Sequence, residues 1–130
     1  MKNNESLNLL LVEDDYVSQL ITSRLLKELG HKVMVVENGL RAIEEIKNFD
    51  YDMIFMDLQM PEMDGITATL KIREEEEKEN KEALTIIALT AHAMKSDKQK
   101  CLEVGMNDYV SKPFTLDDLK NVIERNLNKT

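Results

Sequence analysis

Five short apolar runs alternate with segments of helical periodicity, and this alternation is the feature that most limits how the chain can fold. The runs are residues 7–12, 33–36, 53–56, 85–89 and 109–110. Each has the length of a strand, and a fully apolar run is typical of a parallel strand covered on both faces. Strands that alternate with helices predict an α/β, doubly wound fold, with five parallel strands and helices on both faces of the sheet. Right-handed crossovers leave few topologies, but periodicity does not choose the strand order among them.

Five segments with helical spacing follow the apolar runs. The first has an apolar face made of Val17, Leu20, Ile21, Leu25 and Leu29. The next three are expected at about 39–48, from residue 64 into a charged end, and at about 96–104. The last begins at Thr115, a good N-cap residue, and Asp118 three positions later completes a capping box.

Length and composition predict one domain, 1–130. A chain of 130 residues with 42% apolar residues can bury a core without disulfides, and its single cysteine, Cys101, is expected to be a buried small residue. The net charge of −8 argues against a nucleic-acid-binding surface, which needs clustered Lys and Arg. No apolar run reaches membrane-spanning length and the start, MKNNES, does not look like a secretory signal, so we expect a cytoplasmic domain with no membrane contact of its own.

Carboxylates gather where the first and third apolar runs stop. The first run is followed by Glu13, Asp14 and Asp15, and the third by Asp57. Ligands of open α/β sheets bind beyond the carboxyl ends of the strands, so Asp57 is the best candidate for a reacting group. If the two strands are neighbours, Glu13, Asp14 and Asp57 come together, and their mutual repulsion calls for a cation. Hard oxygen ligands suit Mg²⁺ or Mn²⁺.

A simpler interpretation is that these acids only cap helices. We prefer it for Asp15, as the N-cap of the first helix, and prefer metal binding for Glu13 and Asp14.

Two further strand ends add polar groups to the same edge. Thr90 ends the fourth run with a hydroxyl, and Lys112 follows the fifth run with an ammonium group. Acids, a hydroxyl and an ammonium group together suit an anionic ligand that a metal bridges to the protein. A carboxylate such as Asp57 can act as a nucleophile and form an aspartyl phosphate, while the rest of the site positions the groups and stabilises charge.

Four motifs, LLVEDD, MDLQMPEMDG, ALTA and DYVSKPF, resemble in order and spacing those of receiver domains of two-component response regulators. The resemblance covers nearly the whole chain, and its C-terminal half is most similar to receivers fused to hybrid histidine kinases. It implies a flavodoxin-like, CheY-like fold with strand order 2-1-3-4-5. It also implies phosphoryl transfer to Asp57 from a phosphohistidine on a histidine kinase or histidine phosphotransfer domain.

The same resemblance implies the metal ligands. Asp14, Asp57 and the backbone carbonyl of Gln59 would bind Mg²⁺ directly, and Glu13 would hold the ion mainly through water. Many members have Asp-Asp where this chain has Glu13-Asp14, and Glu is a known variant.

Further roles follow from the resemblance. Thr90 and Lys112 would contact the phosphoryl oxygens, and Tyr109 would turn inward as Thr90 moves toward the phosphoryl group. The Lys112–Pro113 peptide bond is usually cis in the family. The fourth helix, fifth strand and fifth helix would form the output face, and the domain could form a homodimer on phosphorylation.

Two residues are expected to influence how long the phosphoryl group survives. Gln59 is two positions after Asp57, and His92 is two positions after Thr90. Either side chain could overhang the open side of the site, where a hydrolytic water must lie. Gln59 could orient that water through its amide, and His92 could shield the site or donate a hydrogen bond.

Other classes fit the pattern less well. A haloacid-dehalogenase-type phosphatase also uses Mg²⁺ and an Asp nucleophile, but its nucleophile is on the first strand and a second Asp follows two residues later. A flavodoxin-type cofactor binder would need a Ser-, Thr- and Gly-rich loop after the first strand, where this chain has three acids. A receiver that is only a scaffold would lack one of the functional side chains, and none is missing.

Two features receive only structural interpretations. The acidic stretch 74–79 is expected to be a solvated helix end. His31 is expected to face solvent in a loop between a helix and a strand.

Overall fold

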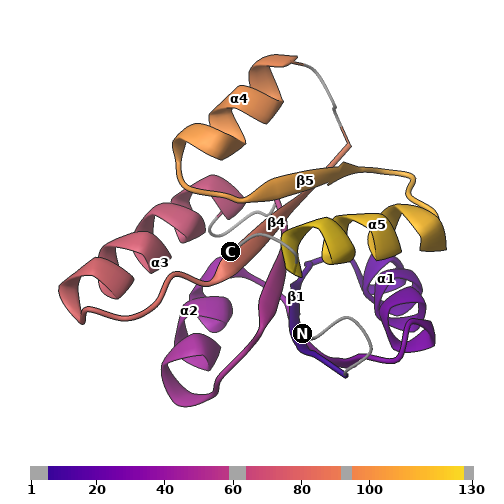
Figure 1. Cartoon of the computed structure of the whole chain (residues 1–130), viewed down its shortest axis with the longest axis horizontal. Coiled ribbons are helices and arrows are strands. Elements are labelled where there is room, and N and C mark those ends of the chain that lie inside the picture. The colour runs from indigo at the N-terminus through magenta and orange to yellow at the C-terminus, as the bar shows by residue number, and fades with distance from the viewer. Residues whose placement is uncertain (1–5, 59–63, 92–94, 128–130) are drawn as a thin grey trace.

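The structure is a computed structural model, and it describes residues 6–58, 64–91 and 95–127. Strands and helices alternate along the chain, as the apolar runs predict (Figure 1). The strands are β1 (Asn8–Val12), β2 (Lys32–Val36), β3 (Met53–Asp57), β4 (Thr85–Thr90) and β5 (Asp108–Ser111). The helices are α1 (Tyr16–Glu28), α2 (Gly39–Asn48), α3 (Gly65–Lys78), α4 (Lys95–Glu103) and α5 (Leu116–Leu127). Within the described ranges, no helix has both the length and the apolar character needed to span a membrane.

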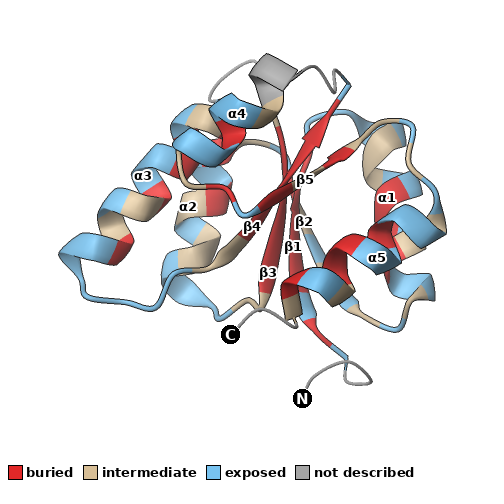
Figure 2. Cartoon of the chain, turned by 45° about the horizontal axis from the view of Figure 1, so that its top comes forward, coloured by how far each residue is buried: buried red, intermediate tan, exposed pale blue. Residues whose placement is uncertain are grey.

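The strands form one parallel sheet in the order β2-β1-β3-β4-β5, which is the order implied by the resemblance. Helices α1 and α5 cover one face of the sheet, and α2, α3 and α4 cover the other (Figure 2). The predicted α/β, doubly wound fold is therefore confirmed.

Strand β3 lies at the centre of the sheet and faces both cores, because successive residues of a strand point to opposite sides. Ile54 and Met56 lie in the core beneath α2, α3 and α4, whereas Met53 and Phe55 lie in the core beneath α1 and α5. All five residues of β3 are buried. The strand thus delivers Asp57, its last residue, to the carboxyl edge of the sheet on a rigid support.

Helix ends follow the predicted capping. The backbone N–H of Ser18 donates a hydrogen bond to Asp15 Oδ2 at 2.9 Å, which confirms Asp15 as the N-cap of α1. Thr115 and Asp118 form the capping box before α5, with backbone-to-side-chain distances of 2.9 and 3.1 Å. Cys101 is buried, as predicted.

Helix α1 departs from its predicted pattern in its first half, although Leu25 and Leu29 of the predicted face pack against the core. Val17, Leu20 and Ile21 of the predicted apolar face are 60%, 52% and 56% exposed, and the neighbouring Tyr16 is 69% exposed. The residues that α1 buries are Thr22, Ser23 and Leu26. At about 100° of rotation per residue, these exposed residues lie roughly 140° around the helix from the buried ones, close to its opposite side. The helix therefore packs its partly polar side against the core and leaves apolar residues exposed on the surface. We call the surface formed by Tyr16, Val17, Leu20 and Ile21 the α1 apolar face.

The stretch 74–79 is mostly exposed at the end of α3, as predicted, but Glu76 within it is an exception, and His31 is also less exposed than the sequence predicts. Glu76, in the stretch 74–79, is buried and accepts a hydrogen bond from the backbone N–H of Leu84 at 2.8 Å. His31 is half-buried, and its Nδ1 accepts a hydrogen bond from the backbone N–H of Leu7 at 3.1 Å. Each residue satisfies a backbone donor just before a strand begins, where the sheet supplies no partner. Charge runs and loop positions do not reveal this need.

Candidate functional site

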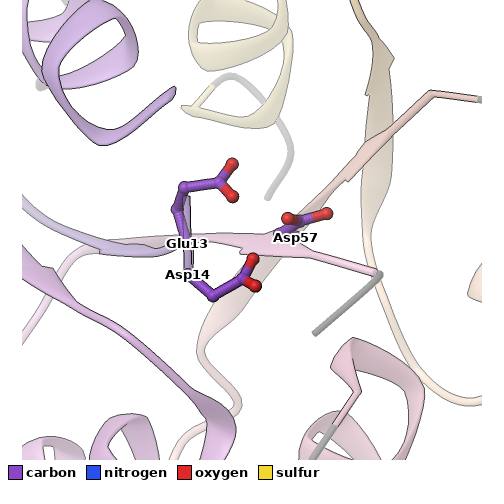
Figure 3. Close-up of side chains that lie close together, drawn as sticks. All are labelled: Glu13, Asp14 and Asp57. Atoms are coloured by element: carbon purple, nitrogen blue, oxygen red, sulfur yellow. The ribbon is translucent and has the colours of Figure 1, made fainter. Parts of the chain in front are cut away.

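Three carboxylates converge at the carboxyl ends of β1 and β3. The sheet pairs Val12 with Met56, so the residues that follow β1 lie beside the end of β3. The side chains of Glu13, Asp14 and Asp57 lie close together (Figure 3), and one oxygen from each lies within 4.8 Å of the others. Glu13 and Asp57 are buried, whereas Asp14 is exposed. The predicted meeting of these three acids is thus present in the structure.

Lys112 reaches this cluster from the end of β5. Its Nζ lies 3.0 Å from Glu13 Oε1 and 3.6 Å from Asp57 Oδ2. Its backbone N–H donates to the carbonyl of Thr90 at 2.7 Å, which ties the segment after β5 to the end of β4. The peptide bond between Lys112 and Pro113 is cis, as the resemblance implies.

The charges in the cluster are not balanced. Burial raises the pKa of the Glu13 carboxyl, and the contact with Asp57 acts in the same direction, although Lys112 opposes them. Burial also lowers the pKa of Lys112, but the carboxylates of Glu13 and Asp57 outweigh it, so that pKa is raised. Three carboxylates and one ammonium group leave negative charge in excess. Oxygen donors with excess negative charge fit a hard divalent cation such as Mg²⁺.

Thr90 and Tyr109 lie on the face of the sheet that α4 covers. Thr90 ends β4 and is buried, and Tyr109 on β5 pairs with Ala88, two residues before Thr90. Residues two apart on a strand share a face, so the Thr90 and Tyr109 side chains point to the same side. Tyr109 is half-buried, and Lys98 Nζ lies 4.8 Å from the centroid of its ring. The two residues thus share one face of adjacent strands, and their coupled movement stays a prediction.

Two residues that hold the site were missed by the sequence interpretation. A Cβ on Gly65 would lie 2.5 Å from the carbonyl oxygen of Asp57, so α3 can begin this close to β3 only with a glycine. Glycine is a poor helix former, so its presence where α3 begins was the available signal for a close approach. The second residue is Gln19, whose Nε2 donates a hydrogen bond to the carbonyl oxygen of Glu13 at 2.6 Å. No sequence motif marks this contact.

Gln59 and His92 lie outside the described residues. The predicted metal contact of the Gln59 carbonyl and the predicted influence of both side chains on phosphoryl lifetime therefore stay predictions.

Comparison with known proteins shows which protein family shares this fold and this site. The family model for the response regulator receiver domain matches residues 9–124. The chain is 47% identical over 129 residues to hybrid signal transduction histidine kinase B of Dictyostelium discoideum. That alignment covers 92% of the chain but only 7% of the kinase, so the chain spans a small part of this relative.

Solved structures agree with the sequence relatives. The receiver domain of the sensor histidine kinase PA1611 from Pseudomonas aeruginosa, which has a magnesium ion coordinated in its active site cleft, superposes with a TM-score of 0.81 at 39% identity. That match covers 92% of this chain and 96% of the other. The receiver domain of Ssk1 from Saccharomyces cerevisiae, solved with the histidine phosphotransfer protein Ypd1, gives a TM-score of 0.85 at 35% identity, with coverages of 91% and 86%.

Proposed function

This chain belongs to the response regulator receiver domain family, the regulatory phosphoacceptor domains of two-component phosphorelays, and we propose that Asp57 is its phosphoacceptor residue. The observation that supports the proposal is the meeting of Glu13, Asp14 and Asp57 within 4.8 Å beside Lys112. This arrangement places a nucleophile, metal-binding oxygens and a cation together at one edge of the sheet. It supplies both the positioning and the charge stabilisation that phosphoryl transfer needs.

Asp57 would act as the nucleophile. One of its carboxylate oxygens forms a bond to phosphorus while the bond from phosphorus to the imidazole nitrogen of the donor breaks, and that nitrogen keeps the electron pair. Lys112 Nζ, 3.6 Å from Asp57 Oδ2, is near enough to contact a phosphoryl oxygen on Asp57. Thr90, buried at the end of β4, would donate its hydroxyl to another.

Glu13, Asp14 and Asp57 would hold the metal, which we assign as Mg²⁺ or Mn²⁺, together with the carbonyl of Gln59. The bound ion would neutralise the carboxylates and the incoming phosphoryl oxygens. The excess negative charge around Lys112 supports this assignment, as does the magnesium ion in the related PA1611 receiver.

The phosphoryl donor would be a histidine kinase or a histidine phosphotransfer domain that docks on the α1 apolar face. This face begins directly after Asp15, the residue that follows the acidic pair, so a partner seated on it would overhang the metal cluster. Four exposed apolar residues on consecutive helical turns form the kind of surface that marks a protein interface. The complex of the related Ssk1 receiver with a phosphotransfer protein supports this class of partner.

Transfer of label from a phosphorylated histidine phosphotransfer domain tests the function and the docking surface together. The wild type should take up the label, and Asp57→Asn should take up none. Leu20→Glu should slow this transfer by about tenfold or more, since burying an unpaired charge weakens docking. Labelling of Leu20→Glu by acetyl phosphate should stay at the wild-type rate.

The control for Leu20→Glu is Leu102→Glu on α4. Leu102 is 53% exposed, close to the 52% of Leu20, and α4 lies on the other face of the sheet. Equal transfer rates for the two variants would contradict the docking surface. Labelling of Asp57→Asn at the wild-type level would contradict the function.

We also propose that the domain is cytoplasmic and that it forms a homodimer when phosphorylated.

The conformational output of phosphorylation would pass through α4, β5 and α5. A phosphoryl group can only favour one of two states that the domain already populates. Amide exchange with and without a phosphoryl mimic should therefore differ across residues 91–112, which connect Thr90 to Lys112. A difference confined to residues 1–48 would contradict this output face.

A further inference from the structure

We propose that Gln19 is a positioning residue for metal binding: its side-chain amide fixes the Glu13–Asp14 peptide so that the Asp14 carboxylate faces the metal cluster. The inference rests on the proposed metal role of Glu13, Asp14 and Asp57. It adds a residue of α1 that acts only through the backbone of Glu13 and Asp14 and contacts neither the metal nor the reacting groups.

Asp14 needs such support more than the other two carboxylates. Glu13 and Asp57 are buried, and Lys112 Nζ lies between them, 3.0 Å from Glu13 Oε1 and 3.6 Å from Asp57 Oδ2. Asp14 is exposed at the first turn after β1. The direction of an exposed, short side chain is set mainly by its backbone, so the peptides on either side of Asp14 decide where its carboxylate points.

Both peptides that flank Asp14 are held by side chains. The carbonyl of the Glu13–Asp14 peptide accepts a hydrogen bond from Gln19 Nε2 at 2.6 Å. The N–H of the Asp14–Asp15 peptide donates to Glu13 Oε2 at 3.2 Å. The backbone of Glu13 is in turn anchored to β2, because its N–H donates to the carbonyl of Val36 at 3.0 Å.

Gln19 is well placed to act as this clamp. It is half-buried in the first turn and a half of α1, and its own N–H donates to the carbonyl of Asp15 at 2.9 Å. An amide is suited to the position because it donates a hydrogen bond without adding charge beside the carboxylates. A rotated Glu13–Asp14 peptide would turn Asp14 away from the oxygens of Glu13 and Asp57, which now lie within 4.8 Å of it.

The test is Mg²⁺ binding by isothermal titration calorimetry, without any phosphoryl donor. Gln19→Met keeps the length of the side chain and removes the donor, and it should raise the dissociation constant about three- to tenfold, the usual effect of losing one hydrogen bond. Gln99→Met, at an exposed position of α4, is the matched control and should bind as the wild type does. At saturating Mg²⁺, labelling of Gln19→Met by acetyl phosphate should return to the wild-type rate, since the reacting groups are intact.

The outcomes separate this inference from the proposed function. If the wild type binds no Mg²⁺, or Asp14→Ala binds as tightly as the wild type, the metal site itself is wrong. If the wild type binds and Gln19→Met binds equally well, only the role of Gln19 is overturned. A lower melting temperature of metal-free Gln19→Met, with labelling reduced at every Mg²⁺ concentration, would show a structural role instead and would also overturn it.

Discussion

Gly65 packs tightly against the backbone that carries Asp57. The first residue of α3 packs on the backbone of Asp57 and Leu58, and a Cβ there would lie 2.5 Å and 3.1 Å from their nearest atoms. A side chain at this position must push either the start of α3 or the end of β3 out of place. The carboxylate of Asp57 and the metal cluster would move with β3.

We therefore expect Gly65→Ala to lower the rate of phosphorylation by acetyl phosphate and to cost about 1–3 kcal/mol of stability, as overpacking does. The control is Gly30→Ala, because Gly30 has a φ of +96° but a Cβ added there would have no heavy atom within 4 Å. That variant should lose stability through backbone strain and keep the phosphorylation rate. Equal phosphorylation of Gly65→Ala and the wild type would show that the contact does not hold Asp57.

The environment of His31 leads us to expect that the free energy of unfolding depends on pH. Its Nδ1 accepts a hydrogen bond from the N–H of Leu7, which requires the neutral ring. Burial lowers the pKa of His31 below the usual value, although Asp52 opposes this shift. The unfolded chain therefore takes up a proton first, near pH 6.5. The contribution of neutral His31 is fully present above that pH and is lost as the pH falls through the lower, folded-state pKa.

Urea unfolding at pH 7.5 and pH 5.5 checks this expectation. The wild type should be less stable at the lower pH. His31→Asn keeps an acceptor in nearly the same place and cannot titrate, so its stability should fall less between the two pH values. If the free energy of unfolding falls equally in both proteins, titratable groups other than His31 cause the pH dependence.

At the scale of an element, α3 is anchored far from the site by a polar cluster. Arg73 Nη1 pairs with Glu76 Oε1 at 2.7 Å, and Arg73 Nε donates to the carbonyl of Gly105 at 2.9 Å. Asn107 Oδ1 accepts from Arg73 Nη2 at 3.0 Å and from the N–H of Ile86 at 2.8 Å. The cluster joins α3 to the starts of β4 and β5, so it fixes the end of the sheet opposite the carboxylates.

Removing Glu76 should break the ion pair with Arg73, which keeps Gly105 and Asn107 as partners, and should leave the N–H of Leu84 without its acceptor. We expect Glu76→Ala to lower the free energy of unfolding by about 2–3 kcal/mol, less than for a fully buried pair because Arg73 is partly exposed. Glu77→Ala is the control, since Glu77 lies next to it and is exposed, and its effect should stay within about 0.5 kcal/mol. Urea titration of both variants measures the difference, and equal losses would contradict the role of the cluster.

Element by element, apolar runs and caps were enough to predict where strands and helices lie, because burial and capping are local requirements. The orientation of α1 could not be predicted, since it depends on how the helix meets β2 and α5. The burial of Glu76 could not be predicted either, because its partner Leu84 is brought close only by the fold. Contacts to backbone atoms of distant residues leave no periodic signal.

At the scale of the whole molecule, the sequence was enough to predict which site residues lie at the carboxyl ends of the strands. Parallel strands bring their carboxyl ends to one edge, so Glu13, Asp14, Asp57 and Lys112 were predicted to meet, and they do. The strand order came from the family resemblance, since periodicity alone allows several orders. The roles of Gln19 and Gly65 could not be predicted, because both residues act on the backbone of the site residues, which leaves no sequence motif.

The central claim is that Asp57 accepts one phosphoryl group in a reaction that needs a divalent ion, and intact-mass spectrometry after incubation with acetyl phosphate and Mg²⁺ tests it most directly. The wild type should gain the mass of a single phosphoryl group, and chelation of Mg²⁺ should prevent the gain. Asp57→Asn, which keeps the shape of the side chain and removes the nucleophile, should gain none. The same yield of phosphorylated protein from Asp57→Asn and the wild type would contradict the account.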